Sequence, residues 1–275
     1  MSDAAVRQVA ALPGVVEAVE SARAACTALR WHPALRRRTD QAQAEATVRA
    51  ARASAAMEGA DLPVDLVREM LVGGRAAPAD VVGQTVSGAL RATVEAGHVP
   101  VQRSPLQALA RLHTAAAAGL VADDQLGRPR AAGEHPLDLA GPGAAPSGPA
   151  LVARLDGLAV LMRAGADVPA LVVAALVHAE VLAVRPFSVG NGVVARALFR
   201  AVVVGRGLDP TAVAVAEVGF EQAGLPAYAA ALTAYTNDGA PGVVGWVRHC
   251  ADAVVRGAQE GARIGDAVVA GRLSG

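Results

Sequence analysis

The chain has 275 residues, of which 53% are hydrophobic and only 18% are charged, so it can bury a sizeable core. Aromatic residues make up 3%, and the core must therefore be built from alanine, valine and leucine. The 25 basic and 25 acidic residues give a formal net charge of zero, which argues against a dedicated nucleic-acid-binding protein. Every basic residue is arginine, a bias that suggests a high-GC bacterial genome.

The cysteines and the apolar runs indicate the compartment. Cys26 and Cys250 lie far apart and form no metal-binding or disulfide pattern, so we expect buried thiols in a reducing compartment. No basic-then-apolar signal segment opens the chain. The most membrane-like run, 168–184, is interrupted by His178 and Glu180. We therefore expect a soluble, cytoplasmic protein with neither a membrane nor a nucleic acid as its partner.

The first hundred residues predict a series of helices. Apolar residues at steps of three and four indicate one helix over 4–30. A second amphipathic stretch covers 39–57, and Gly59 is a natural stop for it. Proline near the first turn indicates two further helices, over 63–71 and 78–95.

The rest of the chain predicts helices around one irregular stretch. Residues 122–149 are dense in glycine and proline without an apolar period, which indicates a loop that is either functional or disordered. Residues 239–242 predict a connecting turn. Because no convincing strand pattern appears outside the loop, the predicted architecture is an all-α bundle. The expected helices cover 105–118, 151–163, 168–184, 195–206, 220–235 and 243–263. The helix over 195–206 is almost wholly apolar and should be buried at the centre.

The most informative stretch, here called the motif segment, is Arg185-Pro186-Phe187-Ser188-Val189-Gly190-Asn191-Gly192-Val193-Val194-Ala195-Arg196. Pro186 ends the helix before it, and Gly190 and Gly192 flank Asn191 in a turn that opens the next helix. A helix N-terminus presents unpaired N–H groups and the positive end of the macrodipole. This turn can therefore hold a phosphate, and Arg196 can reach back toward it. The alternative is an ordinary helix–helix connection.

The motif segment resembles the signature of the Fic (Fido-domain) family, which reads His-Pro-Phe-x-(Asp/Glu)-Gly-Asn-Gly-Arg-x-x-Arg. The residues that match in register are Pro186, Phe187, Gly190, Asn191, Gly192 and Arg196. Three positions depart from it. Arg185 stands where the family has its catalytic His, Val189 where it has an acidic metal ligand, and Val193 where it has the first Arg.

The resemblance implies an architecture and an activity. It implies a Fic-type helical bundle, with an N-terminal helical region over 1–100 and a Fido core over 101–275. The family transfers AMP from ATP to a protein hydroxyl and holds the target segment with a β-hairpin flap. Such a flap, contacting a target protein, would lie within 122–149, where a plain disordered loop is the alternative. The nucleotide or phosphate contacts that the resemblance implies are Phe187, Gly190, Asn191, Gly192 and Arg196.

A second partial motif precedes the core. It reads Ser54-Ala55-Ala56-Met57-Glu58-Gly59 and is similar to the inhibitory motif (Ser/Thr)-x-x-x-Glu-(Gly/Asn) of one Fic subclass. In that subclass the Glu pairs with the last Arg of the signature and obstructs the γ-phosphate of ATP. The resemblance therefore implies an inhibitory helix over about 39–59, regulatory roles for Ser54 and Glu58, and an ion pair between Glu58 and Arg196. The alternative is a surface glutamate before a C-cap glycine.

The departures remove the chemistry that the family uses. Arg185 cannot act as a general base because guanidinium stays protonated, and Val189 has no oxygen for Mg²⁺, so we expect no metal site. His178 lies about 10 Å back along its helix, and nothing in the sequence brings His113 or His249 to the site. We predict a catalytically impaired or inactive pseudoenzyme that binds ATP or another nucleotide. Two alternatives stay open: an active transferase with an altered donor or chemistry, and a helical structural or interaction protein.

Overall fold

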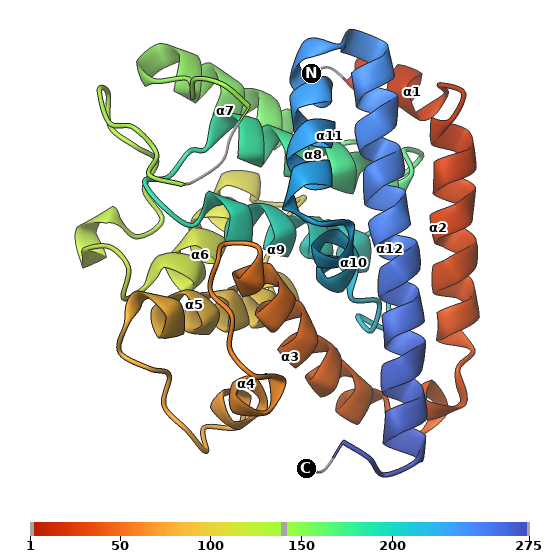
Figure 1. Cartoon of the computed structure of the whole chain (residues 1–275). Coiled ribbons are helices and arrows are strands. Elements are labelled where there is room, and N and C mark those ends of the chain that lie inside the picture. Colours follow the sequence, from red (N-terminus) through yellow and green to blue (C-terminus); the bar gives the residue numbers. More distant parts are fainter. Residues whose placement is uncertain (1–2, 139–141, 274–275) are drawn as a thin grey trace.

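The computed structural model describes residues 3–138 and 142–273 (Figure 1). Twelve α-helices and two short 3-10 helices make up its regular structure. Within the described residues the only β-type pairing is an isolated bridge between Ala118 and Val121, and no sheet forms. The predicted all-α architecture is therefore confirmed.

The amino-terminal helices lie close to the predicted positions, with one break. The expected single helix over 4–30 is wrong, because the chain turns at Pro13 and Gly14 and starts again. Gly14 has a φ of +84°, which a side chain rarely adopts, and it precedes the second helix. The first six elements are α1 Asp3–Ala10, α2 Val15–Arg30, the 3-10 helix η1 Pro33–Arg36, α3 Thr39–Ala56, α4 Val64–Leu71 and α5 Val81–Ala96.

The later helices differ from the prediction at two places, Gly224 and residues 239–242. The expected helix over 220–235 is two helices, which are separated at Gly224, where φ is +84°. Residues 239–242 are not a connecting turn but the first turn of α12, where the missing N–H of Pro241 costs no hydrogen bond. The remaining elements are α6 Pro105–Ala117, η2 Asp123–Gln125, α7 Gly148–Met162, α8 Ala170–Val184, α9 Asn191–Gly205, α10 Ala216–Ala223, α11 Leu225–Asn237 and α12 Gly239–Val269.

The centre of the bundle is formed by α8 and α9, which pack against each other (Figure 1). Almost every residue of α8 and every residue of α9 before its last turn is buried, as expected for apolar helices in a bundle. α5 and α6 cover α9 on one side, while α12 packs against α8 and runs beside α2. The motif segment thus lies inside the fold, at the junction of the two central helices.

A core with few aromatic residues needs close helix contacts, and glycines provide them. A Cβ at Gly88 of α5 would lie 2.0 Å from the carbonyl oxygen of Ala116 in α6. A Cβ at Gly219 of α10 would lie 2.1 Å from the carbonyl oxygen of Ala253 in α12. Because only glycine permits these approaches, the helices that surround the motif segment pack backbone against backbone.

The segment 122–149 does not form the predicted β-hairpin in its described parts, 122–138 and 142–149. Residues 139–141 lie outside the described residues. Instead of pairing with itself, the segment lies along the motif segment. Arg130 N donates to the carbonyl oxygen of Pro186 at 2.7 Å, and Leu137 N donates to that of Ser188 at 2.7 Å. A long irregular stretch is therefore fixed against the start of α9.

Two smaller predictions can be compared with the structure. Cys26 and Cys250 are buried free thiols, as expected. None of the helices formed by the described residues combines the length and the apolar character that a membrane crossing requires.

Candidate functional site

The motif segment is a tight connection between α8 and α9. Arg185 caps α8 with a φ of +45°, and Pro186 prevents the helix from continuing. Gly190, with a φ of +78°, precedes α9, which begins at Asn191. The predicted helix, glycine turn and helix are confirmed, although α9 opens four residues before the expected start at residue 195.

Asn191 holds this turn closed through both ends of its side-chain amide. Its Oδ1 accepts a hydrogen bond from Phe187 N at 2.9 Å, and its Nδ2 donates to Phe187 O at 2.8 Å. The Nδ2 group also donates to Asp138. The side chain is 1% exposed. Only an amide offers a donor and an acceptor in this geometry, so Asn191 fixes the backbone that would face a phosphate.

Phe187 points into the core rather than toward solvent, and its ring stacks on His113 of α6. The two ring centroids are 3.8 Å apart with an interplanar angle of 2°. His113 Nδ1 accepts a hydrogen bond from Gly127 N at 2.9 Å, so the proton of the neutral ring is on Nε2. Burial lowers the pKa of His113 to about 4, and the backbone of Val189 opposes that shift only partly. His113 therefore supports the motif segment and offers no free lone pair to act as a base.

Arg196 is a fully buried cation that α3 and the turn after it neutralise. Its Nη2 donates to Glu58 Oε1 at 2.6 Å and to Ser54 O at 2.8 Å. Its Nε donates to Ser54 Oγ at 2.9 Å. Burial disfavours the charge, but Glu58 and Tyr228 outweigh burial and raise the pKa of Arg196. The structure thus confirms the predicted contact between Glu58 and Arg196, and it adds Ser54 as a second partner of the guanidinium.

Behind Arg196 lies a cluster of neutral aromatic side chains. His178 Nε2 and Tyr228 Oη are 2.6 Å apart. Burial lowers the pKa of His178 well below its usual value and raises the pKa of Tyr228, so both are uncharged. Trp246 and His249 complete the packing around them. His178 is therefore a core histidine, and His249 packs beside it from a half-buried position.

Two carboxylates occupy the start of α9. Asp138 Oδ1 accepts a hydrogen bond from Gly190 N at 2.9 Å, and Oδ2 accepts the bond from Asn191. Glu58 lies over the next residue, because a Cβ at Gly192 would fall 2.0 Å from Glu58 Oε1. Burial raises the pKa of Asp138, and the nearby Glu58 adds to this rise, against the hydrogen bonds from Asn191 and Gly190. The predicted phosphate position is thus filled by the protein's own anions.

Arg185, at the position of the family's catalytic His, is bound by the segment 122–149. Its Nη2 donates to the carbonyl oxygen of Gly143, and its own carbonyl oxygen accepts from Arg130 Nε at 2.8 Å. Burial lowers the pKa of Arg185, and the negative charge of Asp138 opposes this shift. Arg185 is therefore a cation held by a backbone carbonyl group, and its guanidinium cannot act as a base.

Sequence reasoning did not identify Asp138, and it found nothing to bring His113 to the motif segment, where the structure stacks it on Phe187. Asp138 lies 52 residues from Gly190, and His113 comes from α6, a different helix from those that flank the motif. Neither residue has a local pattern that would mark it in the sequence. Within residues 3–138 and 142–273, no group of three or more His, Cys, Asp or Glu side chains could hold a metal ion.

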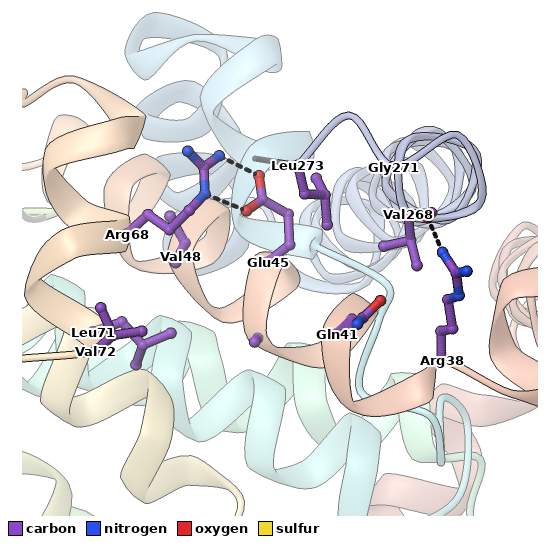
Figure 2. A pocket seen from close by; sticks show the side chains of 11 residues that line it. Arg38, Gln41, Glu45, Val48, Arg68, Leu71, Val72, Val268, Gly271 and Leu273 are labelled. Carbon is purple, nitrogen blue, oxygen red and sulfur yellow. Dashed lines mark hydrogen bonds and ion pairs between the residues drawn. The ribbon is translucent and has the colours of Figure 1, made fainter. Parts of the chain in front are cut away.

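A separate cavity of about 390 Å³ lies between α3, α4 and the end of α12 (Figure 2). Figure 2 shows Glu45 at its wall, with Oε2 accepting from Arg68 Nε at 2.9 Å and Oε1 from Arg68 Nη2 at 3.0 Å. Glu45 is 13 residues before Glu58, which is about 20 Å along a helix. This cavity is therefore distinct from the motif segment.

A search of solved structures finds proteins that share this fold. A Fic family protein from Desulfovibrio desulfuricans G20 matches with a TM-score of 0.71 at 19% sequence identity, over 96% of this chain and 77% of that chain. A fragment of Fic-1 from C. elegans matches with a TM-score of 0.61 at 18% identity, over 89% of this chain and 70% of that chain. No protein-family model and no curated protein matches the sequence. At these identities the likeness establishes the fold and leaves the activity to be argued from the site.

Proposed function

We propose that this chain, which has the Fic fold, is a catalytically impaired or inactive member of that fold class that binds ATP or another nucleotide at the start of α9. The observation that carries the proposal is the ion pair of 2.6 Å between Glu58 and Arg196, made directly over Gly192. An anion already lies at this helix N-terminus. A phosphate oxygen uses the same backbone N–H groups and the same guanidinium once the carboxylate moves away.

The site is suited to holding an anion that arrives from outside. Gly192 leaves room against the backbone that a Cβ would fill. Arg196 stays charged because Glu58 and Tyr228 raise its pKa against the effect of burial. Arg185 adds a second guanidinium, which interacts electrostatically with Asp138 at the turn. Two fixed cations and a helix N-terminus form a binding site for phosphate groups of either a nucleotide or a smaller polyphosphate.

The groups that would transfer AMP are missing from their usual positions. Arg185 cannot accept a proton from a target hydroxyl, and His113 and His178 are buried and already bonded. General base catalysis contributes roughly 10²–10⁴-fold, so its loss alone reduces turnover by that factor. Mg²⁺ does not fit either, because Val189 offers no oxygen and Asp138, the carboxylate that contacts Gly190 and Asn191, is bonded through both oxygens.

We further propose that Glu58 restricts access to this position, as its counterpart does in the Fic subclass with the inhibitory helix. The Glu58 side chain is 23% exposed whereas Arg196 is 2% exposed, so Glu58 is the partner that solvent and a ligand can reach. Replacing Glu58 removes the carboxylate that competes with the phosphate. The guanidinium of Arg196 then remains as an unpaired cation that a ligand can neutralise.

The test is a thermal shift measurement with ATP, ADP and pyrophosphate on the wild type and on Glu58→Gly. A ligand at 100 times its dissociation constant adds about 2.7 kcal/mol of stability, or roughly 5–10 °C in Tm for a chain of this size. We expect a larger shift for Glu58→Gly than for the wild type. Glu20→Gly, which removes an exposed carboxylate on α2, is the control and should respond as the wild type does. The absence of any shift in both forms would reject the nucleotide-binding function.

A further inference from the structure

We propose that Asp138 is a second internal anion at the start of α9, and that a phosphate binds there only after the Asp138 carboxylate leaves its two donors. This inference rests on the proposed function, since it concerns access to the same position. It assigns to an aspartate outside the motif segment, and outside the helix that carries Glu58, a competitive role at the site.

The first support is the set of groups that Asp138 uses. Its Oδ1 accepts from Gly190 N at 2.9 Å, and its Oδ2 accepts from Asn191 Nδ2. Gly190 N and the side chain of Asn191 are donors at the turn where a phosphate would bind. A carboxylate bonded through both oxygens satisfies these donors, and a ligand oxygen can reach them only by replacing it.

The second support is the charge at the site. Two guanidiniums, those of Arg185 and Arg196, face two carboxylates, those of Glu58 and Asp138. The site is therefore neutral before any ligand arrives. Removal of Glu58 alone leaves the Asp138 carboxylate beside the incoming phosphate. Two neighbouring negative charges repel each other strongly when they are partly buried. Full binding thus requires the departure of both carboxylates.

The third support is the way in which the segment is fastened. Arg130 holds the segment through its planar guanidinium group. Its Nε donates to Arg185 O at 2.8 Å. Its Nη1 donates to Glu134 O at 2.5 Å, and its Nη2 donates to Pro146 O at 3.0 Å. Leu137 N adds a bond of 2.7 Å to Ser188 O, one residue before Asp138. The backbone that presents Asp138 is therefore held against the motif segment, which keeps the carboxylate at the donors of the turn.

The experiment is a calorimetric titration of pyrophosphate, and separately of ATP, into four forms of the full chain. These forms are the wild type, Glu58→Gly, Asp138→Asn and the double variant. Asn keeps the size of the Asp138 side chain but removes the charge. Its NH₂ group cannot accept a hydrogen bond from Asn191 Nδ2, as a carboxylate oxygen does. Asp124→Asn, which changes an exposed acid of the same segment, is the matched control.

We expect Asp138→Asn to tighten pyrophosphate binding by at least about tenfold in the Glu58→Gly background, as a lost charge-assisted bond predicts. The Asp124→Asn control should leave the affinity unchanged. An unchanged or weaker affinity in the double variant would overturn the role of Asp138 while leaving the nucleotide-binding function intact. If the double variant binds pyrophosphate tightly but does not bind ATP, the role of Asp138 stands and the nucleotide-binding function is rejected. Absence of pyrophosphate binding in every form would reject both.

A second measurement guards against misfolding of the variant. Hydrogen exchange of the Gly190 amide is followed without ligand in the wild type and in Asp138→Ala. We expect faster exchange at Gly190 in the variant, with unchanged protection in α12 as evidence that the fold is intact. Equal exchange at Gly190 in both forms would show that Asp138 does not protect this N–H group, and the proposed role of Asp138 would be rejected.

Discussion

Arg196 Nη2 and Glu58 Oε1 lie 2.6 Å apart although the two residues are separated by 138 positions in the chain. The pair joins the first turn and a half of α9 to the end of the α3 region. Since Arg196 is 2% exposed, it requires a counter-charge to remain in the core. Glu58 therefore has two effects at once: it stabilises a buried cation and it occupies the space over Gly192.

The first effect predicts a loss of stability. Glu58→Gln keeps the shape of the side chain but leaves Arg196 without a carboxylate partner, beside Ser54, Tyr228 and the neutral amide. We expect unfolding to become easier by about 2 kcal/mol, less than for a fully buried pair because Glu58 is partly exposed. Urea denaturation measures this change. Glu20→Gln, at an exposed pair with Arg23, should cost under about 1 kcal/mol. Equal losses in the two variants would contradict this assignment.

The second effect predicts coupling between Gly192 and Glu58. A Cβ at Gly192 would lie 2.0 Å from Glu58 Oε1, so Gly192→Ala must displace the carboxylate from Arg196. We expect a loss of about 2 kcal/mol in the wild type and a much smaller loss when Glu58 is already Gly. A double-mutant cycle of denaturation curves measures the coupling. Equal costs in both backgrounds would mean that the methyl group collides with something else.

The segment 122–149 should open when its arginine fork is removed. Arg130→Lys keeps the positive charge, but the donors of an ammonium group all lie on one nitrogen and cannot span the carbonyl groups that three separate guanidinium nitrogens reach. We expect protease cleavage within 122–149 to become at least about tenfold faster, because the loss of several bonds raises the open population. Arg128→Lys, which removes a single bond to Asp124 O, is the control. Cleavage at the wild-type rate in Arg130→Lys would show that other contacts hold the segment.

His113 should make the fold sensitive to acid. Burial lowers its pKa from 6.5 to about 4, so the folded state favours the neutral ring. The stability that this ring contributes is complete above about pH 6.5 and is lost as the pH falls toward 4, by up to about 3 kcal/mol. His113→Phe retains the stack on Phe187 and should lose less stability over this range. His98→Gln, at an exposed histidine, should follow the wild type. Identical pH profiles for the wild type and His113→Phe would refute the assignment.

The positions of most helices could be predicted because proline and glycine mark their ends. Pro105 starts α6 and Pro186 ends α8, both as expected. The errors lie where glycine or proline is compatible with more than one structure: either residue can interrupt a helix, and proline can also occupy its first turn. Gly224, which falls inside the expected helix over 220–235, divides α10 from α11, whereas Pro241, which falls inside the expected turn over 239–242, lies in the first turn of α12. Apolar spacing continues through both points, so periodicity could not separate these cases.

The contacts of the site could be predicted from the sequence only where both residues belong to a recognisable motif. Glu58 and Arg196 each belong to a partial motif, and the structure places them in contact. Asp138 and His113 belong to no motif, and their contacts with Asn191 and Phe187 arise from packing between distant segments. The same limit explains the segment 122–149, whose described parts bond to the backbone of the motif segment and not to one another as strands.

The central claim, that the site binds a nucleotide but no longer transfers it, is tested most directly with ATP labelled at the α-phosphate. The labelled ATP is incubated with the wild type, with Glu58→Gly and with Glu58→Gly combined with Asp138→Asn. Retention on the folded protein is measured before denaturation, and covalent label is measured after it. The account predicts label that is retained by the variants and fully released on denaturation. Label that survives denaturation, and that is lost when Arg185 is replaced, would contradict it.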